Sequence, residues 1–135
     1  MKTLYIIRGV PGSGKSTYAK TLGVVHYESD MYFERNGEYK FEKELLPQAH
    51  SWCFRKVREA MDRGEDVAIS NTFTQRWEMK RFVESAQNRD YRVVVVECGH
   101  NFQNTHNVPD EHVERMRRRW QAIPEDWNVE LVRIP

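Results

Sequence analysis

The stretch Leu4-Tyr5-Ile6-Ile7-Arg8-Gly9-Val10-Pro11-Gly12-Ser13-Gly14-Lys15-Ser16-Thr17 decides which fold we expect for this chain. Its first part is a short apolar run of the kind that forms a buried strand. Its second part, from Gly9 onward, satisfies the pattern Gly-x4-Gly-Lys-Ser/Thr in full. Glycine lets such a loop adopt backbone angles that a side chain would obstruct, so that successive N–H groups can approach phosphate oxygens. The stretch therefore predicts a strand, a phosphate-binding loop and a helix, in that order.

This loop contains the residues that we expect to hold a nucleoside triphosphate. They are Gly9, Pro11, Gly12, Ser13, Gly14, Lys15, Ser16 and Thr17. The Lys15 ammonium would reach the β- and γ-phosphates, and the Ser16 hydroxyl would bind the Mg²⁺ that bridges them. The positive end of the following helix would face the same anion. ATP and Mg²⁺ are therefore the expected cofactors, and a glycine-rich structural turn is the alternative.

Composition narrows the class of protein. The 135 residues include 21 Lys+Arg and 20 Asp+Glu, which gives a formal net charge of +1. This balance excludes a protein that holds anions by its overall positive charge. The longest aliphatic run, Val93–Val96, is far shorter than the roughly 20 residues of a membrane span. Cys53 and Cys98 do not make a disulfide framework. We expect one domain over residues 1–135, in the cytoplasm and without a membrane partner.

Apolar stretches alternate with helical patterns along the chain. The candidate strands are Leu4–Arg8, Val24–Tyr27, Asp66–Ser70, Tyr91–Cys98 and Val129–Ile134. The candidate helices carry apolar residues at helical spacing, namely Leu46, Ala49, Cys53, Val57 and Ala60, then Met79, Phe82, Val83 and Ala86, then Val113, Met116, Trp120 and Ile123. The alternation predicts an α/β fold with a mostly parallel sheet of about five strands between two helical layers. With the phosphate-binding loop after the first strand, this arrangement is typical of the P-loop NTPase fold of kinase type. A small lid is expected at approximately residues 99–119.

Asp30 is the second candidate site residue. It follows the second candidate strand, and the carboxyl ends of neighbouring parallel strands meet at one crevice, so it would lie near the triphosphate. A carboxylate in that place can accept the proton of an attacking hydroxyl group. The spacing leaves two alternatives open, which are an N-cap for the turn at Met31–Arg35 and an outer-sphere Mg²⁺ ligand.

A basic helix near the carboxyl terminus could act as a lid over the phosphates. Arg115, Arg118 and Arg119 share one face of it. Arg115 and Arg119 are the candidate catalytic cations, because phosphoryl transfer requires positive charge on the γ-phosphate. The alternative is a solvated face, since Glu111 and Glu114 stand four residues before Arg115 and Arg118.

The end of the third candidate strand carries Ser70 and Asn71, where P-loop enzymes commonly have an acidic residue that supports Mg²⁺. Weaker metal support is therefore expected. The residues after this strand are candidates for binding the acceptor, namely Asn71, Thr72, Phe73 and Arg76. Phe73 is the preferred base-stacking aromatic among Tyr32, Phe33, Tyr39, Phe41, Phe73 and Trp77, for all of which a place in the core is the alternative.

The chain resembles the polynucleotide 5′-hydroxyl kinase group of P-loop kinases over nearly its whole length. The resemblance rests on Gly9–Thr17, Ser29–Phe33, Asn36–Phe41, Ala49–Trp52, Asn71–Thr72, Trp77–Met79, Tyr91–Val93 and His106–Pro109. It implies that Asp30 is the general base toward a 5′-hydroxyl group of DNA or RNA. The chain departs from the group where the phage enzyme has basic residues, at Ser29 and Phe33. A common lid arginine is matched by Gln103, so Arg115 or Arg119 would have to supply that charge.

Together these features predict an Mg²⁺- and ATP-dependent kinase, with the 5′-hydroxyl end of DNA or RNA as the preferred acceptor. A kinase of a nucleoside or another small hydroxyl compound is the first alternative, because the same catalytic groups would serve it. A catalytically weak, ATP-binding regulatory protein is the second, in view of Gln103 and the missing carboxylate at Ser70 and Asn71.

Overall fold

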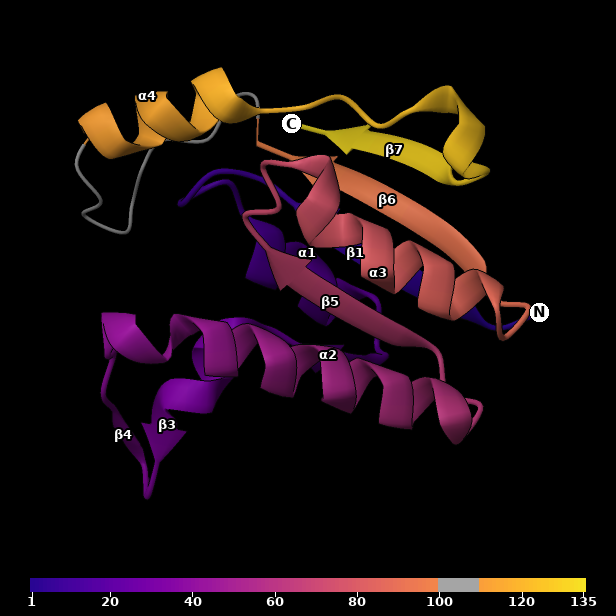
Figure 1. Cartoon of the computed structure of the whole chain (residues 1–135), viewed down its shortest axis with the longest axis horizontal. Coiled ribbons are helices and arrows are strands. Elements are labelled where there is room, and N and C mark those ends of the chain that lie inside the picture. Colours follow the sequence, from indigo (N-terminus) through magenta and orange to yellow (C-terminus); the bar gives the residue numbers. More distant parts are fainter. Residues whose placement is uncertain (100–109) are drawn as a thin grey trace.

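A parallel sheet forms the centre of the computed structural model, which describes residues 1–99 and 110–135 (Figure 1). Within these residues the main sheet has five strands in the order β2-β5-β1-β6-β7, and every neighbouring pair is parallel. The strands are β1 (Thr3–Arg8), β2 (Val25–Tyr27), β5 (Val67–Asn71), β6 (Arg92–Cys98) and β7 (Glu130–Ile134). The predicted α/β fold with a five-stranded parallel sheet is confirmed.

Helices cover both faces of this sheet. The α-helices of the described residues are α1 (Lys15–Thr21), α2 (Leu46–Asp62), α3 (Arg76–Gln87) and α4 (Asp110–Arg119), of which the first three cover the sheet. Figure 1 shows α2 and α3 in front of the sheet and α1 behind it. Alternate residues of β1 face the two layers, because successive side chains of a strand point to opposite sides. Leu4 and Ile6 join the core with α2 and α3, whereas Ile7 joins the core with Ala19 of α1.

The predicted apolar spacing describes α2 and α3 well and α4 less well. The residues predicted to be buried in α2 and α3 are buried, with the exception of Leu46, which is half-buried. In α4 only Val113 among the described residues is buried, and the helix ends at Arg119, before Trp120 and Ile123. The predicted helical pattern therefore runs too far, because Ile123 packs against the core and Trp120 stacks on the buried Arg8 from the irregular segment that follows α4.

Two peripheral elements flank the edge of the sheet at which its strands end. One is a hairpin of β3 (Glu34–Arg35) and β4 (Glu38–Tyr39), and the other is α4 (Figure 1). The hairpin turns at Asn36 and Gly37, whose φ angles of 53° and 80° are those of a tight two-residue turn. The predicted lid includes residues 100–109, with Gln103 and His106–Pro109, which lie outside the described residues. No helix in the described part of the chain is long and apolar enough to cross a membrane.

Candidate active site

The loop between β1 and α1 has the backbone geometry of an anion cradle. Gly12 and Gly14 have φ angles of 82° and 88°, in the left-handed region that side chains disfavour. Gly9 has a different requirement, because a Cβ atom there would lie 2.3 Å from the hydroxyl oxygen of Ser13. The loop closes through a hydrogen bond from the Ser13 N–H to the Val10 carbonyl at 3.2 Å. Glycine is therefore required at these positions for two different physical reasons.

Lys15 and Ser13 give this loop unused capacity for an anion. The Lys15 Nζ atom donates to the Val10 carbonyl at 3.2 Å. Burial lowers the pKa of Lys15, and the nearby carboxylates of Glu28 and Asp30 partly oppose that shift. The Ser13 hydroxyl is buried and has no hydrogen-bond partner among the described residues. A phosphate group would pair with a desolvated ammonium of this kind, so the residues present fit a nucleotide.

Ser16, the expected Mg²⁺ ligand, lies at the start of α1 and contacts an acidic residue that the sequence reasoning missed. Its hydroxyl donates to the Oε2 atom of Glu28 at 2.7 Å. The Ser70 hydroxyl donates to the same atom at 3.1 Å. Hydroxyl and carboxylate oxygens are ligands that Mg²⁺ accepts together with phosphate and water, so this donor set fits the ion. The sequence does contain a signal for this residue, because Glu28 directly follows Tyr27 at the end of a candidate strand.

Asp30 lies on the exposed side of the same edge. It belongs to a 3-10 helix over Ser29–Phe33 whose N-cap is Glu28, so the alternative that Asp30 caps this turn is wrong. The Tyr39 hydroxyl of the hairpin donates to its Oδ1 atom at 3.4 Å. Burial raises the pKa of Tyr39, and the Asp30 charge adds to that shift. Asp30 stands two residues after Glu28, whose carboxylate accepts from the Ser16 hydroxyl at 2.7 Å, so it follows directly on the segment that contacts the phosphate-binding loop.

A small cavity of about 100 Å³ lies beside the end of β5. Its lining residues are His50, Asn71, Thr72, Phe73, Trp77, Glu78, Arg81 and Phe82. Three of the four predicted acceptor-binding residues are among them, and Arg76 is not. The Asn71 Oδ1 atom accepts from the Ser29 N–H at 3.1 Å, and the Ser29 hydroxyl is 2.8 Å from His50 Nδ1, which links the cavity to the helical turn of Asp30.

The aromatic residues of this cavity have different surroundings. Phe73 is only 4% exposed and packs edge-on against Phe82, with 5.6 Å between ring centroids, as the core alternative predicted. Trp77 is 71% exposed. Its indole N–H donates to Gln75 at 2.6 Å, which fixes the ring at the start of α3. An exposed ring held in this way offers a surface on which a base can stack, whereas Phe73 does not.

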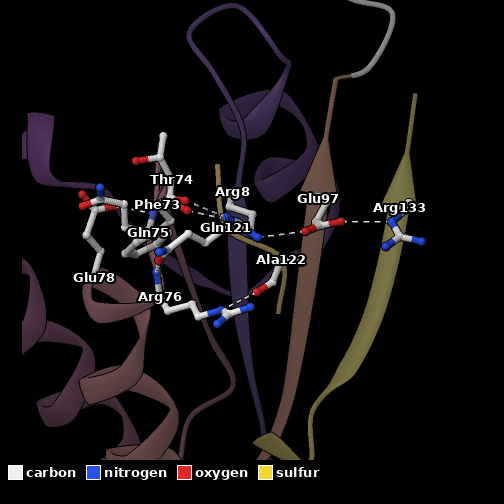
Figure 2. Close-up of polar contacts among 10 residues, drawn as sticks. All are labelled: Arg8, Phe73, Thr74, Gln75, Arg76, Glu78, Glu97, Gln121, Ala122 and Arg133. Carbon is white, nitrogen blue, oxygen red and sulfur yellow. Dashed lines mark hydrogen bonds and ion pairs between the residues drawn. The ribbon is translucent and has the colours of Figure 1, made fainter. Parts of the chain in front are cut away.

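Arg76 lies at the start of α3, and its contacts differ from those expected of an acceptor-binding residue. Its backbone N–H donates to the Gln121 side chain at 2.8 Å, and its guanidinium Nε donates to the Ala122 carbonyl at 2.7 Å (Figure 2). These bonds join α3 to the segment that follows α4. The structure therefore brings the Arg76 side chain to this segment and away from the cavity.

Arg8 ends β1, as the sequence predicts, and its side chain also joins three segments at this edge of the sheet. Arg8 is fully buried, and its guanidinium donates to Glu97 at 2.9 Å and to the carbonyls of Phe73 and Thr74 at 3.0 and 3.2 Å (Figure 2). Burial lowers the pKa of Arg8 to about 10, and Glu97 partly opposes that shift. These bonds hold the loop after β5 against the strand that precedes the phosphate-binding loop.

The arginines predicted to act as a lid lie on α4, apart from this set of contacts. Arg115 and Arg119 are exposed, and Arg115 has a contact of 3.5 Å with His112. The one ion pair within the described residues of α4 joins Arg117 to Glu114 at 2.8 Å, so neither of the two pairs expected from the sequence is formed there. In residues 1–99 and 110–135, no hydrogen bond joins Arg115 or Arg119 to the phosphate-binding loop.

Comparisons with known sequences identify relatives of the chain. A family model described as an AAA domain matches residues 4–101. Human NEDD4-binding protein 2 is 35% identical over 136 residues, a region that spans 89% of this chain and 8% of that protein. An uncharacterized protein of Pasteurella multocida is 31% identical over 134 residues, covering 86% of this chain and 75% of that protein. The chain thus corresponds to a small part of the human relative.

Similar solved structures agree on the fold. A sugar kinase from Janibacter superposes with a TM-score of 0.70 at 14% identity, over 99% of this chain and 85% of that chain. Kti12 of Chaetomium thermophilum, in complex with ADP-AlF3, gives a TM-score of 0.66 at 13% identity, with 97% and 88% coverage. A chain of the Pnkp1/Rnl/Hen1 complex gives 0.58 at 18% identity, with 93% and 42% coverage. At these identities the likeness shows a P-loop kinase-like fold.

Proposed function

Because this chain belongs to the AAA domain family and has a P-loop kinase-like fold, we propose that it is an Mg²⁺- and ATP-dependent phosphotransferase. It transfers the γ-phosphate to a hydroxyl acceptor, with the 5′-hydroxyl end of DNA or RNA preferred. One observation carries the proposal, namely that Asp30 is exposed and stands two residues after Glu28, whose carboxylate accepts a hydrogen bond from Ser16 of the phosphate-binding loop at 2.7 Å. A base and a phosphate-binding cation at one edge are the two groups that such a transfer requires.

The reaction assigns a role to each group. The loop amides and Lys15 hold the β- and γ-phosphates, and Mg²⁺ held by Ser16 and the nucleotide neutralises their charge when bound. The acceptor hydroxyl oxygen bonds to the γ-phosphorus as the bond from that phosphorus to the bridging oxygen of ADP breaks. The acceptor proton passes to Asp30, which the Tyr39 hydroxyl orients from the hairpin. Arg115 and Arg119 close over the transferring group from α4.

The cavity beside β5 supports a nucleic-acid end as the acceptor. It opens next to the exposed ring of Trp77, on which a terminal base can stack. The base would lie across the mouth of the cavity, with one edge inside. Asn71 lines the cavity and offers hydrogen bonds to that edge.

A second candidate is a kinase of a nucleoside or another small hydroxyl compound. Ser29 and Phe33 stand where the phage enzyme has basic residues, and both are buried here, at 4% and 3% exposure. The Ser29 hydroxyl contacts His50, and the Phe33 ring packs against Phe41 with 5.2 Å between centroids. These two positions therefore offer no charge to an acceptor phosphate, which favours an acceptor without a phosphate backbone.

Transfer from γ-labelled ATP tests both candidates. The acceptors are a 5′-hydroxyl oligonucleotide, a panel of nucleosides and sugars, and buffer alone. Asp30→Asn should lower kcat on the true acceptor about a hundredfold or more while ATP affinity stays unchanged, because only the proton acceptor is lost. Glu34→Gln is the matched control, since it neutralises an exposed carboxylate of the hairpin.

The outcomes separate the candidates. Label on the oligonucleotide that depends on Asp30 supports the preferred reading, and Trp77→Ala should then raise the KM for the oligonucleotide without changing kcat. Label on small acceptors alone contradicts the oligonucleotide and supports the second candidate. Tight ATP binding without transfer to any acceptor contradicts both and indicates an ATP-binding regulatory protein.

A further inference from the structure

Glu28 lies where the ends of two neighbouring strands meet the phosphate-binding loop. β2 pairs with β5 so that Tyr27 is opposite Ile69, and the next residue of each strand brings Glu28 beside Ser70. The Glu28 Oε2 atom accepts hydrogen bonds from Ser16 at 2.7 Å and from Ser70 at 3.1 Å. This carboxylate therefore contacts the loop hydroxyl that is expected to bind Mg²⁺.

The hydrogen-bond partners of this carboxylate are neutral. Within residues 1–99 and 110–135, no lysine or arginine nitrogen lies within 4.0 Å of Glu28. Its one ion-pair candidate there is His26, at 3.9 Å, and burial lowers the pKa of that imidazole. The Glu28 side chain is also 28% exposed. The Glu28 carboxylate is thus oriented by hydroxyl groups and forms no ion pair with a lysine or arginine of the described residues.

The chemistry of Mg²⁺ explains what such a carboxylate can do. Mg²⁺ takes oxygen ligands, keeps several waters and is held by one or two carboxylates together with substrate phosphates. The end of β5 has Ser70 and Asn71 and lacks a carboxylate for this purpose. Glu28 stands one strand away from that position, directly after β2. A hydroxyl group has one proton, so a Ser16 hydroxyl that donates to Glu28 keeps its lone pairs for another partner.

We propose that Glu28 is the carboxylate of the divalent-cation site at the phosphate-binding loop, filling from β2 the role that β5 leaves open. It acts as a positioning residue, because it accepts a hydrogen bond from the Ser16 hydroxyl and so turns the lone pairs of that oxygen toward the cation. Its charge also attracts the metal-bound waters. The inference rests on the proposed function, since the cation arrives with the nucleotide phosphates.

Binding of a fluorescent ADP analogue, mant-ADP, tests the role of Glu28 without using phosphoryl transfer. The wild type, Glu28→Gln and the control Glu34→Gln are titrated in EDTA and at rising MgCl2. In Glu28→Gln the Mg²⁺ concentration that gives half of the gain in affinity should rise about tenfold to a hundredfold. In EDTA the same variant should bind mant-ADP as well as the wild type or better, because a negative charge near the phosphates is gone.

These opposite responses separate a cation site from a merely structural contact. Equal weakening of Glu28→Gln in EDTA and in MgCl2 would overturn the inference, and so would an unchanged Mg²⁺ dependence. Glu28→Asp keeps the charge, so its half-maximal Mg²⁺ concentration should return part of the way to the wild-type value. Such a recovery would show that the effect in Glu28→Gln comes from the lost charge and not from a folding defect. Failure of the wild type to bind mant-ADP would contradict the proposed function itself. Binding that depends on Glu28, with no transfer to any acceptor, would leave this inference standing.

Discussion

Two carboxylates at the same edge of the sheet, Glu97 and Glu28, have opposite surroundings. Glu97 lies on β6, is 5% exposed, and accepts from the guanidinium groups of Arg8 at 2.9 Å and Arg133 at 3.0 Å (Figure 2). Glu28 follows β2, is partly open to solvent, and accepts from the hydroxyl groups of Ser16 and Ser70. One carboxylate is paired with two arginines, whereas the other has no lysine or arginine partner among the described residues.

This difference shows which kind of carboxylate is structural and which is available for binding. The Glu97 charge compensates the buried Arg8 guanidinium, and that guanidinium holds the Phe73 and Thr74 carbonyls. A cation that approached Glu97 would have to displace two arginines. A cation that approached Glu28 would displace none within the described part of the chain. The two groups should therefore respond differently to the same chemical change, carboxylate to amide.

The largest effect is expected at Glu97. Glu97→Gln leaves Arg8 buried without its counter-charge, and removal of one partner of a buried pair costs about 3–5 kcal/mol in the free energy of unfolding. Urea denaturation followed by circular dichroism measures this loss. Arg133→Gln is the control, because the Arg133 side chain is 66% exposed and should contribute no more than about 1 kcal/mol. Equal losses in both variants would show that Arg8 is not the group that needs Glu97.

The Arg8 and Glu97 pair marks the limit of what the sequence could predict about the fold. The alternation of apolar stretches located the five strands of the main sheet to within one residue at each end. Arg8 ends β1 in an otherwise apolar stretch, and its partner Glu97 is 89 residues away in the sequence. Local periodicity contains no information on such a pairing, because it depends on the strand order in the finished sheet.

The candidate site was predictable to the same extent. The loop pattern identified Lys15 and Ser16 because it is local, and the end of a strand located Asp30. P-loop enzymes commonly have an acidic residue at the position that ends β5 here. In this chain the carboxylate that contacts Ser16 is Glu28, at the end of the neighbouring strand β2. Arg76 was expected at the acceptor, but its guanidinium donates to Ala122 in a segment 46 residues further along the chain. Both differences arise from packing between distant segments.

An intermediate effect is expected at Trp120, which contacts the same buried arginine without sharing its charge pair. The Arg8 guanidinium carbon lies 3.6 Å from the centroid of the Trp120 ring, as in a cation–π contact. Trp120→Leu should lower the free energy of unfolding by about 1–2 kcal/mol, because the partner cation is desolvated. Thermal denaturation measures the change, with Trp77→Leu as the control, since Trp77 is 71% exposed. A loss as large as that of Glu97→Gln would contradict the greater weight given to the charge pair.

A smaller effect is expected from pH, through the histidine next to Glu28. Burial lowers the pKa of His26 from its ordinary value of 6.5, Glu28 partly opposes this shift, and Lys20 adds to it. The unfolded chain therefore takes up a proton near pH 6.5 that the folded chain refuses until lower pH. Stability should fall as the pH drops from about 6.5 through the folded-state pKa of His26. Urea denaturation between pH 7.5 and about 5 should show a flatter dependence in His26→Gln than in the wild type, and parallel curves would contradict the assignment.

The smallest change in stability is expected where the proposed cation site lies. Glu28→Gln keeps an oxygen that accepts a hydrogen bond from Ser16 or Ser70, and it leaves no buried cation without a partner in the described residues. The free energy of unfolding should therefore change by less than about 1 kcal/mol. Urea denaturation beside Glu97→Gln makes the comparison direct, because the two variants carry the same substitution. A loss of about 3 kcal/mol or more at Glu28 would give it the structural role of Glu97. A near-zero change, combined with the shift in Mg²⁺ dependence, would assign this carboxylate to binding.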